Sequence, residues 1–155
     1  MRDGWGIFAR RLHTALKAAA VEVQDRARQS HDFTTHTGLL ERSVQVDTRY
    51  AYQADVYLNE RMAKYGPFVH GGTKPHRIFP KRKAFGKKRR ALRWVGDGQF
   101  VFARGVRHPG TKADPFLHEA LQSSRGEIDR IFRRYVDLTL EEVADSVGRT
   151  SYTIR

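Results

Sequence analysis

The chain has 155 residues and no cysteine, which excludes disulfide scaffolds and thiolate zinc sites. It also lacks any run of about 18 apolar residues, the length that a membrane-spanning helix needs. The first 20 residues carry scattered charges and no compact apolar segment with a cleavage site, so they do not resemble a secretory signal. These absences predict a soluble protein that has no membrane contact and is intracellular when synthesised.

Acidic residues are almost missing from the segment 74–112. It holds 13 Lys or Arg and one acid, Asp97, so its net charge is 13 − 1 = +12. The whole chain has 29 basic and 17 acidic residues, also +12, so the remainder sums to 16 − 16 = 0. Such a concentration of charge on one segment predicts contact with a polyanion or with an acidic protein surface.

The candidate contact residues are cations of this segment. The run 81–90 holds seven of them, and because it repels itself it is expected to form a projecting loop. The candidate contacts to a partner or to DNA are Lys81, Arg82, Lys83, Lys87, Lys88, Arg89, Arg90, Arg104 and Arg107. The aromatic residues between these cations have two interpretations. They stack on bases, or, as we expect, Trp94, Phe100 and Phe102 alternate inward and are buried in a hairpin core.

The first half of the chain predicts a long helix followed by a hairpin. Apolar residues recur every three or four positions over 5–29, from Trp5 and Phe8 onward, which indicates an amphipathic helix. A helical turn over 37–43 is expected to be capped by Thr37. Alternating apolar residues over 43–48 and 51–58 predict two antiparallel strands joined by a short turn.

The second half predicts further strands and a closing helix. A short helix within 59–70, broken or kinked by Pro67 and ended by glycines, precedes a strand over 77–79. Residues 91–95 and 99–103 flank Gly96-Asp97-Gly98 and predict a second hairpin. Asp114 as N-cap and Pro115 as first helical residue open about 30 helical residues. This stretch forms one helix, or two with a break near 124–126 or at Thr139.

This order predicts an α+β fold. An antiparallel sheet of about four to five strands would be packed by the long N-terminal and C-terminal helices, with the basic loop projecting. We expect a single domain over 1–148, with the basic loop 74–112 inserted in it, and a C-terminal tail over 149–155.

Catalytic and metal-binding patterns are weak. Asp114 and His118 are four residues apart on one helical face, but no third metal ligand follows at a suitable spacing. A metal-free ribonuclease using His76, His108, Arg107 and a lysine is chemically feasible but is the less favoured alternative. The sequence therefore predicts no enzyme, no cofactor and no metal.

An ordered set of short motifs resembles the small tail-completion or head–tail joining proteins of long-tailed bacteriophages. After the N-terminal helix come Thr-Gly-x-Leu-x-x-Ser over 37–43 and Tyr-x-x-x-Val-x-x-Gly-Thr over 65–73. These motifs are followed by a strand over 76–80 and a basic stretch ending at Leu92. The last two motifs are Val-Arg-His-Pro-Gly-Thr-Lys over 106–112 and Pro-Phe-Leu over 115–117. The set spans about 8–122. The structural motif residues are Gly72, Thr73, Pro109, Gly110, Asp114 and Pro115. The chain departs from the family where an acid usually precedes Gly71, and in its longer basic run.

The resemblance implies a structural virion protein of the phage neck. Relatives form a ring, with six copies to match a six-fold tail, between head-closure, tail-terminator or tail-tube proteins. The implied location is the virion neck or tail, with the host cytoplasm during assembly, and the basic segment would face a neighbouring ring or genomic DNA in the channel. The alternative is a nucleic-acid-binding protein that uses the segment 74–112.

Overall fold

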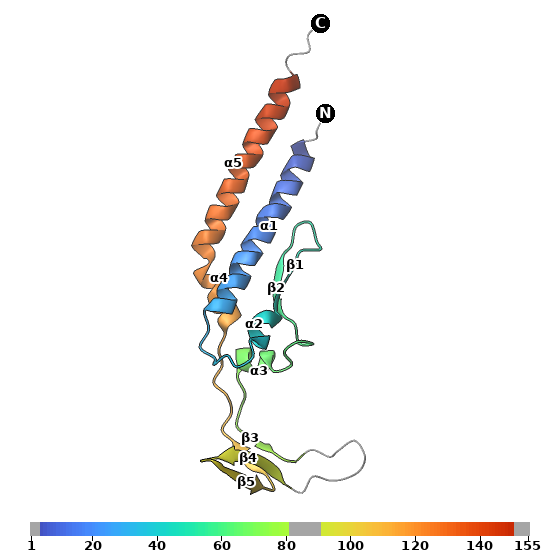
Figure 1. Ribbon diagram of the computed structural model, residues 1–155. Helices are drawn as coiled ribbons and strands as arrows, with labels where there is room; N and C mark the ends of the chain where they lie inside the picture. The colour runs from blue at the N-terminus through green and yellow to red at the C-terminus, as the bar shows by residue number, and fades with distance from the viewer. Residues whose placement is uncertain (1–3, 81–90, 151–155) are drawn as a thin grey trace.

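Two long helices form the frame of the molecule. The computed structural model describes residues 4–80 and 91–150. Helix α1 (Gly4–Gln29) and helix α5 (Arg125–Thr150) lie side by side and run in opposite directions, so both chain ends lie at one end of the molecule (Figure 1). At the opposite end a β-rich extension projects from the helices. We call residues 73–111 the arm, and residues 4–72 and 112–150 the body.

Helix α1 packs through small side chains. Its buried residues include Ala15, Ala19 and Ala27, whose short side chains let neighbouring helices approach closely. The predicted helix is confirmed, but the start of its apolar stripe is not buried, since Trp5 is 63% exposed and Phe8 is 41% exposed. Across the helix pair, Arg10 and Arg11 each lie 2.8 Å from the carboxylate of Glu142.

The first hairpin covers one side of α1. Helix α2 (Leu39–Ser43) leads into β1 (Val44–Asp47), which pairs antiparallel with β2 (Asp55–Leu58). The hairpin prediction is confirmed, although its connection is longer than the expected turn. The predicted cap at Thr37 is wrong, because the N-cap of α2 is Gly38, which has φ 65° and provides no side chain.

Helix α3 (Gly66–Gly71) leads the chain out of the body. Pro67 lies in its first turn, where the missing N–H costs nothing, so it starts the helix and does not break it. Gly72 ends the helix with φ 68°, a conformation that favours glycine.

The arm contains two antiparallel strand pairs. Strand β3 (His76–Ile78) pairs with β6 (Val106–His108), and β4 (Leu92–Gly96) pairs with β5 (Gln99–Ala103). The predicted hairpin around Asp97 is confirmed. Asp97 and Gly98 both have positive φ, 49° and 77°, as a tight two-residue hairpin turn requires.

The predicted break in the closing helix is confirmed near Ser124. Helix α4 (Phe116–Ser123) ends there, and α5 begins at Arg125. Helix α5 continues to Thr150, and residues 151–155 of the predicted tail lie outside the described residues.

The predicted α+β class is confirmed. The expected single sheet of about four to five strands is wrong, because the described residues form three separate two-stranded antiparallel ladders. The core lies where α1, α2, β1 and α4 meet, and its members are Val23, Ala27, Leu40, Val44, Ala63, Phe116 and Ala120. Among residues 4–80 and 91–150, none of the helices has an apolar stretch that meets the length of a membrane span.

Candidate functional site: the projecting arm

The junction between body and arm is built from the predicted structural motifs. Thr73 and Thr111 form a two-way backbone bridge with N–O distances of 2.9 and 3.1 Å. The two segments lie so close that a Cβ at Gly110 would collide with the carbonyl oxygen of Thr73. A Cβ at Gly72 would lie 2.8 Å from the carbonyl oxygen of Thr111. Motifs almost 40 residues apart in sequence therefore meet where the chain leaves and re-enters the body.

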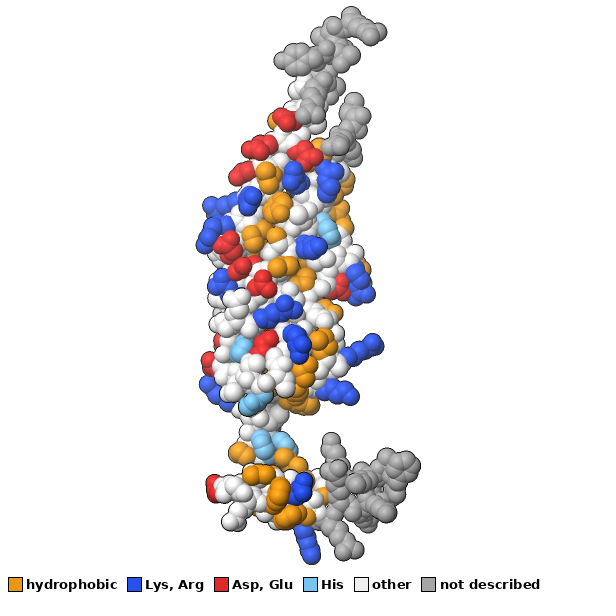
Figure 2. Space-filling model, in the orientation of Figure 1, with side chains coloured by type: hydrophobic (Ala, Val, Ile, Leu, Met, Phe, Trp, Pro, Cys, Tyr) orange, Lys and Arg blue, Asp and Glu red, His pale blue; other side chains and the backbone are white. Residues whose placement is uncertain are grey.

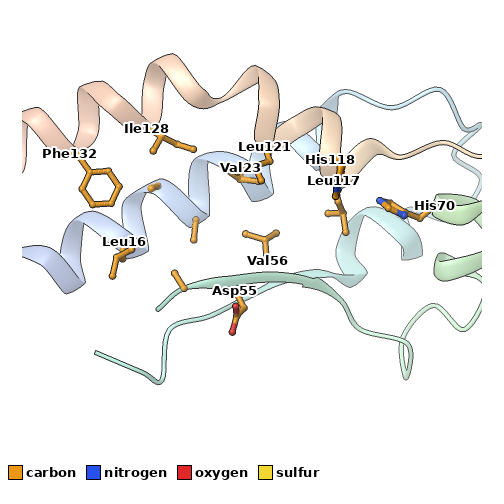
Figure 3. A pocket seen from close by; sticks show the side chains of 13 residues that line it. Leu16, Val23, Asp55, Val56, His70, Leu117, His118, Leu121, Ile128 and Phe132 are labelled. Atoms are coloured by element: carbon orange, nitrogen blue, oxygen red, sulfur yellow. The ribbon is translucent and has the colours of Figure 1, made fainter. Parts of the chain in front are cut away.

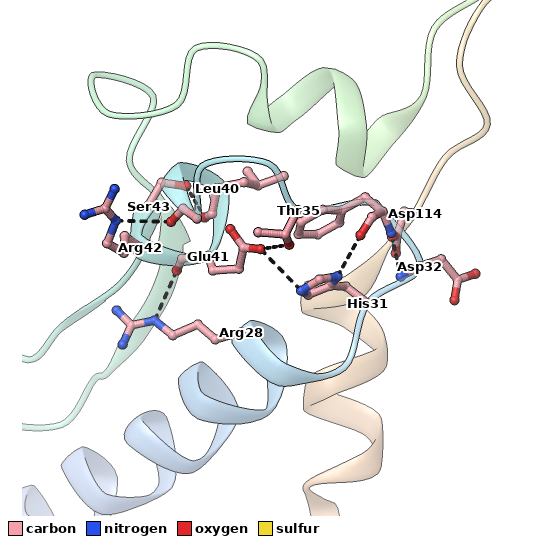
Figure 4. Close-up of polar contacts among 11 residues, drawn as sticks. Arg28, His31, Asp32, Thr35, Leu40, Glu41, Arg42, Ser43 and Asp114 are labelled. Carbon is pink, nitrogen blue, oxygen red and sulfur yellow. Dashed lines mark hydrogen bonds and ion pairs between the residues drawn. The ribbon is translucent and has the colours of Figure 1, made fainter.

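Asp114 joins this junction to the N-terminal half of the body. Its predicted role as a helix cap is wrong, because Pro115 is the N-cap of α4 and no side chain caps that helix. Instead, the Asp114 carboxylate, which is buried, accepts hydrogen bonds from the backbone N–H groups of Asp32 and Phe33, at 2.8 and 2.9 Å (Figure 4). These two hydrogen bonds join residues 82 and 81 positions apart, and no pattern in the sequence predicts them.

Next to this contact, Glu41 is held by several donors (Figure 4). The Thr35 hydroxyl donates to its carboxylate, and His31 Nε2 lies 3.6 Å from the same oxygen. Burial opposes ionisation of Glu41. The hydrogen bonds from Thr35 and from the Glu41 backbone, with the charges of His31 and Arg42, nevertheless hold its pKa below the ordinary value of 4.5.

The pair β3–β6 places two arginines opposite each other. Arg77 and Arg107 are Cα partners, so their side chains leave the same face, and both are exposed. Neither has an acidic partner among the described residues. Like charges in this arrangement destabilise a ladder unless an anion lies between them. This face is therefore suited to bind phosphate or carboxylate groups.

The opposite face of β3–β6 carries two histidines. The rings of His76 and His108 stack with their centroids 5.1 Å apart. His76 Nδ1 donates to the carbonyl oxygen of Lys74, whereas His108 Nδ1 accepts from the N–H of Gly110. The ribonuclease alternative requires His76, His108 and Arg107 near one another. The two histidines share one face of the β3–β6 ladder, whereas Arg107 lies on the opposite face.

The aromatic side chains of β4–β5 are exposed. Phe100 and Phe102 are 61% and 65% exposed, and Trp94 is 41% exposed, so the prediction that they are buried is wrong. Burial requires a second layer, and the described part of the arm supplies none for these rings. Figure 2 shows hydrophobic side chains on the surface of the arm.

The predicted contact cations are only partly within the described residues. Arg104 is exposed between β5 and β6, and Arg107 belongs to the arginine pair. The others, Lys81, Arg82, Lys83, Lys87, Lys88, Arg89 and Arg90, lie outside the described residues. Arg77 and Arg93 were not among the contact residues that we expected from the sequence. The signal for them was available, since Arg77 lies in the predicted strand 77–79 and Arg93 in the predicted strand 91–95.

Within residues 4–80 and 91–150, no three His, Asp or Glu side chains gather at one point to hold a metal ion. The Asp114 carboxylate accepts hydrogen bonds from backbone amides. The ring of His118 lies near that of His70, with the two centroids 6.4 Å apart. The described residues of the arm thus present arginines, stacked histidines and exposed aromatic rings.

No protein-family model matches the chain, and neither a curated protein nor a solved structure is detectably similar to it.

Proposed function

We propose that this chain is a structural protein of the neck of a long-tailed bacteriophage, where copies of it form a ring that joins the head to the tail. One observation carries the proposal: a cationic arm with unburied aromatic rings projects from a helical body. Exposed apolar patches of this kind mark surfaces that other macromolecules cover.

Two further features support assembly as the function. Within the described residues, each strand of the arm belongs to a two-stranded ladder and is therefore an edge strand, and such edges favour pairing with another chain. A lone two-stranded hairpin is only marginally stable in water, so a partner that covers it contributes to its stability. The ordered motifs over 8–122 supply the resemblance to phage neck proteins.

The test is assembly of virions in the phage that encodes the chain. Replacing Lys87, Lys88, Arg89 and Arg90 with Ala is expected to leave folding intact and to leave full heads and free tails unjoined. The two products are counted by electron microscopy of lysates.

The matched control removes the same number and types of cation from the exposed surface of the body, at Lys17, Arg61, Lys64 and Arg133. It is expected to join heads and tails normally. Normal yields of infectious particles from the arm variant would refute an assembly role for the arm's charge.

A second candidate function is nucleic-acid binding by the free monomer. The exposed pair Arg77 and Arg107, which lacks an acidic partner among the described residues, favours it. Each phosphate contact releases counterions, so the logarithm of the affinity for a labelled DNA or RNA oligonucleotide would fall steeply with that of the salt concentration. Replacing Arg77 and Arg107 with Gln would reduce this slope by about 2. A monomer with no affinity at low salt would remove this candidate.

A further inference from the structure

The strand pair β3–β6 carries two histidines at the end nearest the body. His76 and His108 are Cα partners, and their rings stack with the centroids 5.1 Å apart. Each ring is hydrogen-bonded to the backbone two residues closer to the junction. His76 Nδ1 donates to the carbonyl oxygen of Lys74 at 2.9 Å, and the N–H of Gly110 donates to His108 Nδ1 at 3.1 Å. We call His76 and His108 the junction histidines.

The junction histidines lie beside the bridge that joins the two segments of the junction. Thr73 and Thr111 exchange two backbone hydrogen bonds, and the N–H of Thr111 also lies 3.0 Å from the Thr73 hydroxyl. Gly110, which has φ 95°, lies in sequence between this bridge and His108. Figure 1 shows the arm joined to the body through these two chain segments. Polar contacts at residues 73–76 and 108–111 therefore hold the arm in its direction relative to the body.

The hydrogen bond from Gly110 requires an uncharged His108. A backbone N–H can only donate, so His108 Nδ1 carries no proton when this bond is present. An imidazolium ring carries a proton on both nitrogens, so protonation of His108 removes the bond and sets two N–H groups against each other. His76 differs, because its Nδ1 is already the donor and a second proton goes to Nε2. The Gly110 bond thus depends on the charge of His108 alone.

The surroundings of His108 are cationic. The neighbouring charged or titratable groups are His76, Lys74 and Arg77 on the β3 side and Arg104, Arg107 and Lys112 on the β6 side. The one acid in the described part of the arm, Asp97, lies in the β4–β5 turn, and the nearest acid along the chain, Asp114, binds two backbone amides of the body. No ion pair within the described residues brings an acid to either junction histidine. A proton on His108 therefore adds a positive charge that no acid offsets, and protons on both rings place like charges opposite each other.

We propose that the junction histidines are a pH-sensitive lock on the arm. With His108 neutral, its ring holds Gly110 and the arm keeps one direction relative to the body. A proton on His108 releases Gly110, and the arm then moves about the segments 72–75 and 109–113. Because the released state binds more protons, the locked state is favoured at high pH and is lost as the pH falls. This inference goes beyond the proposed function, since it concerns movement within one chain.

The body contains a second histidine pair, which is a competing source of any response to pH. His70 and His118 line one end of a groove of about 450 Å³ between helices α1, α4 and α5 and strand β2 (Figure 3). Their ring centroids are 6.4 Å apart, and the buried Nε2 atom of His70 forms no hydrogen bond within the described residues. The experiment must therefore assign the response to His108 and not to this pair.

Two spin labels measure the direction of the arm. The chain has no cysteine, so Gln99→Cys in β5 and Gln122→Cys in α4 give one exposed labelling site in the arm and one in the body. Nuclease-treated labelled protein is diluted with excess unlabelled chain, so that dipolar electron paramagnetic resonance reports distances within one copy. The distance distribution is expected to be narrow at about pH 8 and broad at about pH 5, values on either side of the ordinary histidine titration. Glu41 stays ionised over this range, because its pKa lies below 4.5.

Two substitutions of His108 decide whether this ring is the lock. The Oδ1 atom of Asn can take the place of Nδ1 and accept from the Gly110 N–H without titrating, so His108→Asn is expected to give the narrow distribution at both pH values. His108→Ala has no acceptor and is expected to give the broad distribution at both. The matched control, His118→Asn in the body, is expected to respond to pH like the wild type. Circular dichroism checks that all variants keep their helices.

Amide hydrogen exchange measured by NMR follows the hydrogen bond itself. After correction for the intrinsic effect of pH on exchange, protection of the Gly110 amide in the wild type is expected to fall about fivefold as the His108 ring gains its proton, the effect of losing one neutral hydrogen bond. In His108→Asn the protection is expected to stay constant.

Four results would each overturn the proposal. They are a wild-type distance distribution that is the same at both pH values, a response to pH that persists in His108→Asn, a narrow distribution for His108→Ala at the higher pH, and loss of the response in His118→Asn. Constant protection of Gly110 while the His108 ring titrates would equally exclude the lock.

Discussion

The body and the arm differ in how their apolar side chains are placed. The core of the body includes Phe116, which is fully buried, and ring contacts from Phe33 and His70 surround it. The described part of the arm has no buried side chain, and its largest apolar residues face water. Burial of apolar area is the main source of stability in a fold, so the body is expected to hold the chain together. The arm adds surface for contacts and little stability of its own.

The largest effect on stability is expected from Phe116→Ala. Phe116 lies within the core cluster, with its ring centroid 5.2 Å from that of Phe33. Removing it leaves a cavity among well-packed neighbours, so the free energy of unfolding should fall by about 3–5 kcal/mol. Urea denaturation followed by circular dichroism measures the loss. If the free energy of unfolding falls by less than about 1 kcal/mol, the core either repacks to fill the cavity or contributes little to stability.

A smaller effect is expected from Asp114→Ala, which separates the junction of the arm from the N-terminal half of the body. The N–H groups of Asp32 and Phe33 would lose a charged acceptor, so the unfolding free energy should fall by about 1.5–3 kcal/mol. Asp114→Asn keeps one acceptor oxygen and should lose less, which thermal unfolding of both variants would measure. Equal losses for Asn and Ala would show that the charge of Asp114, and not its hydrogen bonding, stabilises the contact.

Glu41 gives the stability of the body a dependence on pH. Its pKa is lower in the folded state than the ordinary 4.5, so its stabilising effect is fully present above that value and is lost as the pH falls through the folded pKa. Glu41→Gln should therefore lower stability at pH 7 and flatten the decline of stability below pH 4.5. Urea denaturation across this range measures both slopes. Parallel curves for the variant and the wild type would assign the acid sensitivity to other groups.

The smallest effect is expected from Phe102→Ser in the arm. This side chain is 65% exposed, so its removal should change the unfolding free energy of the monomer by no more than about 0.5 kcal/mol. The measurement is made at a protein concentration where the chain is monomeric. A loss as large as that from Phe116→Ala would show that the arm has a core of its own and would end the distinction between the two regions.

Particular residues show why parts of the fold were predictable. The α1 helix follows from local periodicity, and the β4–β5 turn follows from Asp97 and Gly98, which tolerate positive φ. Gly72 and Gly110 were predicted as structural motif residues. The steric reason for glycine at position 110 is that a Cβ there would collide with the carbonyl oxygen of Thr73, a contact that only the fold creates. Local sequence patterns predict which helix, strand or turn each segment can form. They do not predict which segments contact one another in the folded chain.

The sequence by itself determined the helices, the hairpins and the concentration of charge in 74–112, because these depend on residue order and composition over short windows. Only the tertiary structure decided that Asp114 binds the amides of Asp32 and Phe33, that Arg77 faces Arg107, and that Phe100 and Phe102 are exposed. The physical reason is that burial and pairing depend on which second layer packs against a strand. Alternation alone places Phe100 and Phe102 on one face of a hairpin, and nothing in the described body or arm covers that face.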